Sequence, residues 1–95
     1  MGLGKAFDAI KQARELQKLL RDVEVEVDSG GGAVRLRMNG LQEIIEIVIE
    51  ERVIDPTKAK KLADLIKQAV NEANKKAQVA AAQEMRSRGM GMPGM

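Results

Sequence analysis

Hydrophobic residues in the first part of the chain recur with the period of an α-helix, over residues 3–21. This segment has no Gly or Pro after Gly4 and is rich in residues that favour helices. On a helical projection one arc is apolar and contains Ile10 at its edge, Ala13, Leu16 and Leu20. A separate arc, about 80° wide, carries four cations: Lys11, Arg14, Lys18 and Arg21. The predicted helix can therefore pack on one face and present a row of positive charge on another.

The middle of the chain alternates between apolar and polar residues, which predicts β-strands. Valines and carboxylates alternate strictly over residues 23–28, and a second alternation follows after the turn Ser29-Gly30-Gly31-Gly32. Its apolar positions are Val34, Leu36 and Met38. Asn39-Gly40 is a favoured hairpin turn, because both residues tolerate a positive φ. With a third strand over residues 42–50, the pattern predicts a three-stranded antiparallel meander.

The third predicted strand is apolar on both faces. We expect Ile45, Ile47 and Ile49 to face the core, and Ile44 and Val48 to lie on the opposite face. An apolar pair on an otherwise polar face indicates that something covers it, either the chain's own helix or a partner subunit, and we favour the partner. The predicted dimer interface therefore consists of Ile44, Ile45, Ile47 and Val48.

Charged residues line the polar face of the predicted sheet. The carboxylates of Glu24, Glu26 and Asp28 can lie across from Arg35 and Arg37, which can also face Glu46. Opposite charges on neighbouring strands stabilise a sheet by roughly 0.2–1 kcal/mol per pair. Paired carboxylates could instead serve acid–base chemistry or bind a metal, but without His or Cys we expect these charges to hold a solvated face together.

A second, longer helix is predicted from Asp55-Pro56 to about Arg88. Asp is a favoured N-cap, and Pro is favoured at the first helical position, where its missing N–H costs nothing. Large apolar residues are concentrated before Val70 and alanines dominate afterwards. We therefore expect the first half to pack on the sheet, and the second half to project as an arm or to approach another helix closely. The chain is predicted to form one domain, residues 1–88, and a flexible Gly/Met tail, residues 89–95.

Composition limits both the core and the chemistry. Phe7 is the one aromatic among 95 residues, and so small a core suggests that a second copy completes the interior, in a homodimer. The chain has no Cys and no His, which removes disulfides, thiolate sites and the commonest general base. We expect no enzyme activity, no cofactor and no metal site. The methionines at 85, 90, 92 and 95 could suggest a soft-metal site, but a loose tail is the favoured interpretation.

The charge is segregated along the chain. Residues 1–22 hold five basic and three acidic side chains, residues 23–55 three and eight, and residues 56–95 eight and three. The two segments predicted to be helical are thus basic and the sheet is acidic. No apolar run reaches the ~20 residues needed to cross a bilayer, and the charged N-terminus is unlike a secretory signal, so a cytoplasmic protein is expected.

The order of elements and several local motifs resemble the YbaB/EbfC family. Lys11-Gln12-Ala13-Arg14-Glu15-Leu16-Gln17 resembles the family's first helix, and residues 30–40, with the Gly-rich turn and Asn-Gly, resemble its central hairpin. Asp55-Pro56, the Leu-rich helix that follows, Asn71-Glu72-Ala73 and the Gly/Met/Pro tail also fit. The match covers nearly the whole chain. The first helix is shorter here than in typical members, because the sheet begins by Val23.

This resemblance implies a bacterial, nucleoid-associated homodimer whose sheets join centrally while the helices protrude like tweezers. It implies binding of double-stranded DNA with limited sequence preference. Carried onto this chain, it implicates basic residues of both helices: Lys11, Arg14, Lys18, Arg21, Lys67, Lys75, Lys76, Arg86 and Arg88.

The predicted function is therefore salt-sensitive binding of DNA phosphates, with release of counterions, by basic helical arms. The basic stripes could instead be ordinary solvated faces, since Lys11 and Glu15 are spaced to pair along the helix. The main alternative is a structural or adaptor dimer that binds a DNA-repair or replication protein through the same arms. No small-molecule substrate and no membrane partner are expected.

Overall fold

The computed structural model describes residues 2–89 and has the predicted α+β architecture. The elements, in order, are α1 (Leu3–Asp22), β1 (Glu24–Ser29), β2 (Val34–Asn39), β3 (Ile44–Ile49), two short 3₁₀ turns (Glu51–Val53 and Pro56–Lys58) and α2 (Ala59–Ser87). The strands form one antiparallel sheet in the order β1-β2-β3. The helix, the meander and the long second helix predicted from the sequence are thus confirmed.

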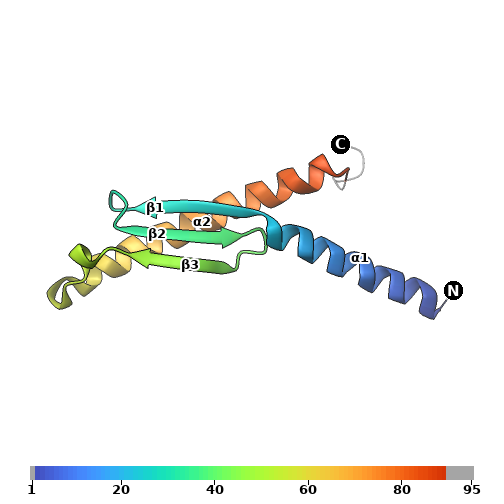
Figure 1. The fold of residues 1–95 in the computed structure, drawn as a ribbon, viewed down its shortest axis with the longest axis horizontal. Helices are drawn as coiled ribbons and strands as arrows, with labels where there is room; N and C mark the ends of the chain where they lie inside the picture. Colours follow the sequence, from blue (N-terminus) through green and yellow to red (C-terminus); the bar gives the residue numbers. More distant parts are fainter. Residues whose placement is uncertain (1, 90–95) are drawn as a thin grey trace.

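The molecule is elongated because both helices extend beyond the sheet. Its radius of gyration is 18.1 Å, whereas a compact domain of this length has one of roughly 12 Å. The chain measures 63 Å along its longest axis. Figure 1 shows that α1 and the C-terminal half of α2 leave the same end of the sheet and diverge. Two separate helical arms result.

The core lies between α2 and the first two strands, and alanines make the contact. Ala69, Ala73 and Ala77 of α2 are fully buried. They pack with four buried side chains of the sheet: Val27, Val34, Leu36 and Met38. The expectation that the alanine-rich part of the helix would leave the sheet is wrong in this region. Small side chains let the helix axis approach the strands closely, so Ala73 and Ala77 are core residues, and the arm begins after them.

A β-bulge in β3 corrects the predicted faces of that strand. Ile47 is paired with Leu36 and Ile49 with Val34, but the register shifts between Arg37 and Met38, so that Ile44 pairs with Met38. Residues paired across antiparallel strands share a face of the sheet. Ile44 therefore lies on the core face, not on the opposite face as predicted, and Ile45 is the extra residue of the bulge. Val48, opposite Arg35, lies on the polar face as expected.

The loop between β2 and β3 is also built differently from the predicted Asn-Gly hairpin turn. Its one positive φ belongs to Gln42, at 64°, and not to Asn39 or Gly40. The Asn39 side chain organises the loop, since its Oδ1 accepts hydrogen bonds from the amides of Leu41 (2.9 Å) and Glu43 (3.0 Å). Gly40 serves another purpose, because its backbone contacts the end of α1.

The start of α2 follows the predicted cap, with one difference. The Asp55 carboxylate accepts a hydrogen bond from the Thr57 amide at 2.9 Å, and Pro56 follows it. The first turn, Pro56–Lys58, is 3₁₀ rather than α-helical. At the other end the helix stops at Ser87, and Gly89 has a φ of 72°. Residues 90–95, most of the predicted tail, lie outside the described residues.

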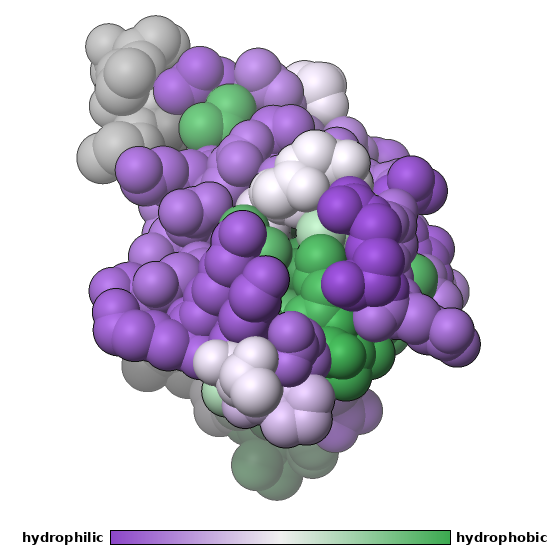
Figure 2. Space-filling model, turned by 90° about the vertical axis from the view of Figure 1, so that its left-hand side faces the viewer, coloured by the Kyte–Doolittle hydropathy of each residue, from purple (hydrophilic) through white to green (hydrophobic). Residues whose placement is uncertain are grey.

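The end of the molecule opposite the arms has a hollow with both apolar and charged walls. It lies where the 3₁₀ turns meet α2, and it is lined by Val53, Leu62 and Leu65 together with Arg52, Asp55, Lys58 and Lys61. Figure 2 views this end and shows apolar residues within a hydrophilic rim. The neighbouring Ile54 is 59% exposed.

Candidate nucleic-acid interface

The base of α1 is fixed to the loop between β2 and β3. The Gly40 amide donates to the carbonyl oxygens of Leu20 and Val23, both at 2.9 Å. A Cβ at Gly40 would lie 2.6 Å from the Leu20 oxygen, so the close approach requires glycine. Gly40, a residue with no side chain, therefore fixes where this arm leaves the sheet.

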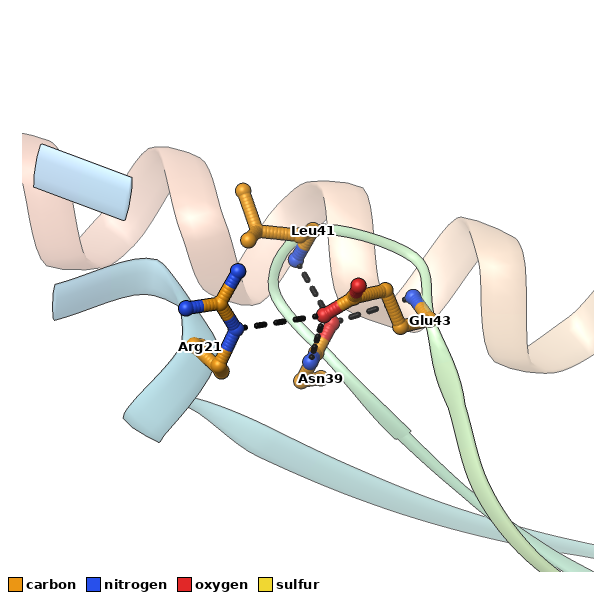
Figure 3. A network of polar contacts seen from close by, with 4 residues as sticks. All are labelled: Arg21, Asn39, Leu41 and Glu43. Carbon is orange, nitrogen blue, oxygen red and sulfur yellow. Dashed lines mark hydrogen bonds and ion pairs between the residues drawn. The ribbon is translucent and has the colours of Figure 1, made fainter. Parts of the chain in front are cut away.

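Polar side chains reinforce the same junction (Figure 3). The Glu43 carboxylate accepts hydrogen bonds from Asn39 Nδ2 at 2.8 Å and from Arg21 Nε at 3.4 Å. These donors, Asn39 first and then Arg21, lower the pKa of Glu43 below its usual value of about 4.5. Arg21, predicted to bind DNA, is thus engaged with Glu43 at the base of the arm.

Beyond this junction, α1 carries unpaired positive charge. Lys11, Arg14 and Lys18 are exposed, and in the described part of the chain none of them forms an ion pair. Lys11 and Glu15, although suitably spaced, are not joined by a salt bridge. The alternative interpretation, in which acidic residues of the same helix neutralise this stripe, therefore does not hold for the conformation in the structure.

The cations in and just after α2 that were predicted to bind DNA divide into two groups. Lys67, Lys75 and Arg86 are exposed and, among residues 2–89, form no ion pair. Lys76 lies 4.0 Å from Glu72, and its Nζ also donates to the Glu26 carbonyl at 3.5 Å. Arg88 pairs with Glu84 at 2.8 Å.

The acidic charge of the sheet is partly neutralised within the sheet itself. Arg37 lies 3.1 Å from Glu24 and 3.6 Å from Glu46, as the strand alternation predicted. Such exposed pairs contribute little stability, roughly 0–1 kcal/mol each. The sheet separates the carboxylate-bearing face from the helical arms, so the protein has positive ends and an acidic centre.

Strand β3 is an edge strand with an apolar surface that α2 does not bury. Ile44, Ile45, Ile47 and Val48 are each 41–47% exposed. In the described residues the helix covers mainly β1 and β2. An apolar edge strand with free backbone groups invites pairing with another chain.

Two exposed apolar features were missed by the sequence reasoning. Phe7 is 64% exposed on α1, next to the cation stripe, and Leu3 is 75% exposed nearby. Ile54, which follows β3 in the chain, is 59% exposed. The helical projection contained the first signal, because Phe7 falls between Arg14 and Lys18 on the cationic arc.

Residues 2–89 show neither of two other kinds of site. No helix there has both the length and the apolar character needed to cross a membrane. No group of three or more Asp or Glu side chains in residues 2–89 is arranged to hold a metal ion.

Comparison with known families matches residues 2–92 to the model of the YbaB/EbfC DNA-binding family. The chain belongs to this family. The YbaB/EbfC family is characterised by DNA binding rather than by a catalytic reaction, which agrees with the two basic arms.

Curated relatives are similar over nearly their whole length. A nucleoid-associated protein of Clostridium acetobutylicum is 39% identical over 104 aligned positions, covering 100% of this chain and 93% of the relative. One from Ruminiclostridium cellulolyticum is 42% identical, covering 97% and 89%. Because this chain has 95 residues, the Clostridium protein contains residues that have no counterpart here.

The fold is also found in a solved structure. The crystal structure of an uncharacterized protein from Helicobacter pylori superposes with a TM-score of 0.66, covering 93% of this chain and 92% of the other. At 22% sequence identity, this likeness establishes the shared fold.

Proposed function

We propose that this YbaB/EbfC protein is a homodimer that binds double-stranded DNA, with little sequence preference, through its two kinds of helical arm. The observation that carries the proposal is a group of exposed cations on α1 and α2, none with an ion-pair partner among residues 2–89: Lys11, Arg14, Lys18, Lys67, Lys75 and Arg86. The two helices leave the same end of the sheet. Arg21, Lys76 and Arg88 complete the proposed surface with smaller contributions, because carboxylates already accompany them.

The mechanism is electrostatic. Each lysine or arginine that neutralises a phosphate releases condensed counterions, so the logarithm of the affinity falls with the logarithm of the salt concentration by about 0.9 per contact. The described residues contain no zinc-ligand set and no row of aromatic side chains for base stacking. Contacts to phosphates alone carry no sequence information.

Dimerisation through β3 supports this mechanism by doubling the number of arms. The exposed residues Ile44, Ile45, Ile47 and Val48 supply an apolar surface, and the edge strand supplies unpaired backbone groups. Two sets of arms on one duplex raise the effective concentration of each set at the DNA. The acidic face of the sheet is repelled by phosphates, which leaves the arms to make the contacts.

The names of the relatives support a location of this protein within the cell. The Clostridium and Ruminiclostridium proteins are named nucleoid-associated proteins. A basic, DNA-binding protein of this family is accordingly proposed to act on the bacterial nucleoid, in the cytoplasm.

The experiment is a mobility shift on random-sequence duplex at several salt concentrations. The proposal predicts a shift at low salt that weakens steeply as salt rises, with Kd near the 10⁻⁴–10⁻⁶ M range of non-specific binders at physiological salt. The absence of a shift even at low salt would refute DNA binding and favour the adaptor that binds a repair or replication protein. An adaptor interface built on apolar contacts predicts affinity that resists salt.

A further inference from the structure

The tip of α1 holds an exposed apolar cluster, Leu3, Phe7 and Ile10, which neither the electrostatic mechanism nor the sheet-centred dimer uses. These side chains are 75%, 64% and 49% exposed. Phe7 and Ile10 line a shallow hollow of about 400 Å³ whose other walls are Lys11, Arg14, Glu15 and Lys18. The one aromatic residue of the chain thus lies within the stripe of unpaired cations.

The position of the cluster separates it from the proposed dimer interface. Phe7 precedes Leu20, where the arm is anchored, by thirteen residues, or roughly 20 Å at 1.5 Å per residue. Figure 1 shows α1 projecting freely from the sheet over this distance. The tip therefore lies well away from β3, the strand along which the partner subunit is proposed to bind.

The cations around the apolar cluster indicate which kind of molecule binds there. A second copy of α1 would bring Lys11, Arg14 and Lys18 towards an identical set, and like charges repel. Three side chains also fall short of the roughly 800 Å² per partner that a stable protein interface buries. A polyanion with an apolar interior matches both the apolar cluster and the cations around it. Duplex DNA is such a polyanion, because its stacked bases lie between rows of phosphates.

We propose that Phe7, supported by Leu3 and Ile10, is a wedge that inserts between adjacent base pairs while Lys11, Arg14 and Lys18 bind the flanking phosphates. This inference rests on the proposed DNA-binding function and gives it a second action, deformation of the duplex. Apolar wedges of this kind unstack base steps and kink DNA. Glu15, on the rim of the same hollow, lies at the edge of the cationic arc, beyond Lys18 and Lys11 on the side away from Phe7.

The test uses Phe7→Trp in the full-length protein, which contains no Trp and no Tyr, so the new indole is its only strong fluorophore. Random duplex should quench this indole by more than half at saturation, because stacked bases quench it. Heparin, a polyanion without bases, should leave its intensity nearly unchanged. Ile54→Trp, at the end of the molecule opposite the arms and at a site 59% exposed, is the matched control and should respond weakly to both.

A second measurement follows the DNA. Energy transfer between the labelled ends of a short duplex should report bending by the wild type and little bending by Phe7→Ala. The affinity of Phe7→Ala for DNA should be reduced about tenfold through lost stacking.

Binding detected by anisotropy of labelled duplex, without quenching of Phe7→Trp, would overturn the wedge and leave the proposed function standing. A lack of any binding would overturn both. A blue shift of the indole on anionic phosphatidylglycerol vesicles, with no quenching by DNA, would assign the tip to a lipid surface instead.

Discussion

The amide of Gly40 donates to the carbonyl oxygen of Leu20 at 2.9 Å, and this contact joins the loop between β2 and β3 to the last turn of α1. Residues twenty positions apart in sequence thereby set where the first arm leaves the sheet. The arm itself makes few other contacts with the body of the protein. Its direction therefore depends on this junction.

Gly40→Ala should destabilise the protein and loosen α1. The added Cβ would lie 2.6 Å from the Leu20 oxygen, which is backbone and cannot rotate away. Overpacking of this kind costs about 1–3 kcal/mol, measurable by urea unfolding. Gly4→Ala is the control, since nothing lies within 4 Å of its Cβ. It should be neutral or slightly stabilising, and equal effects of the two substitutions would contradict the proposed role of Gly40.

The Glu43 network predicts an acid-sensitive junction. Hydrogen bonds from Asn39 and Arg21 lower the folded-state pKa of Glu43 below about 4.5. A depressed carboxyl pKa contributes stability at pH values above the unfolded pKa, and this contribution is lost as the pH falls through the folded pKa. Wild type should therefore be more stable than Glu43→Gln at about pH 6, and the difference should shrink below about pH 4. A difference that is constant across this range would show that the charge of Glu43 is irrelevant. Asp55, whose pKa is lowered by Thr57, titrates in both proteins and cancels in the comparison.

Reversal of charge on α2 tests the DNA surface. Lys67, Lys75 and Arg86 changed together to Glu should abolish the mobility shift near physiological salt while the dimer survives, because three favourable phosphate contacts per subunit become repulsive. Lys58, Lys60 and Lys61 changed together to Glu are the matched control, with the same charge change near the start of α2, away from the arms. Equal loss in both triple variants would mean that net charge, and not the position of these three cations, governs binding.

The proposed interface is tested with Ile47→Asp. Ile47 lies opposite Leu36 on the core face of β3 and is 41% exposed. A carboxylate there should give monomeric or unfolded protein, because its burial in a dimer without a partner group is costly. Light scattering measures the mass, and circular dichroism separates a folded monomer from an unfolded chain. Val79→Asp, on the α2 arm, should remain dimeric. An intact Ile47→Asp dimer would rule out an interface centred on β3.

Much of the fold could be predicted from local sequence patterns. The alternation of valines and carboxylates in β1 has the period of a strand, and Asp55-Pro56 placed the start of the second helix to within a turn. These signals depend on neighbouring residues, so they survive without tertiary information. The stripe of Lys11, Arg14 and Lys18 was likewise visible, because helical geometry alone brings residues three and four apart onto one face.

Contacts between distant residues decided the rest. A bulge at Ile45, which follows from pairing with β2, moved Ile44 to the core face, and no periodicity within β3 reveals this shift. Ala73 and Ala77 resembled an arm in sequence, yet they are buried because their small side chains allow close packing on β1 and β2. Gly40 resembled a turn residue, yet it is required by the backbone of α1. The sequence by itself determined the elements and their charged faces, since these depend on local geometry. Only the tertiary structure decided which faces are buried and which cations are free, since burial and pairing depend on what lies opposite.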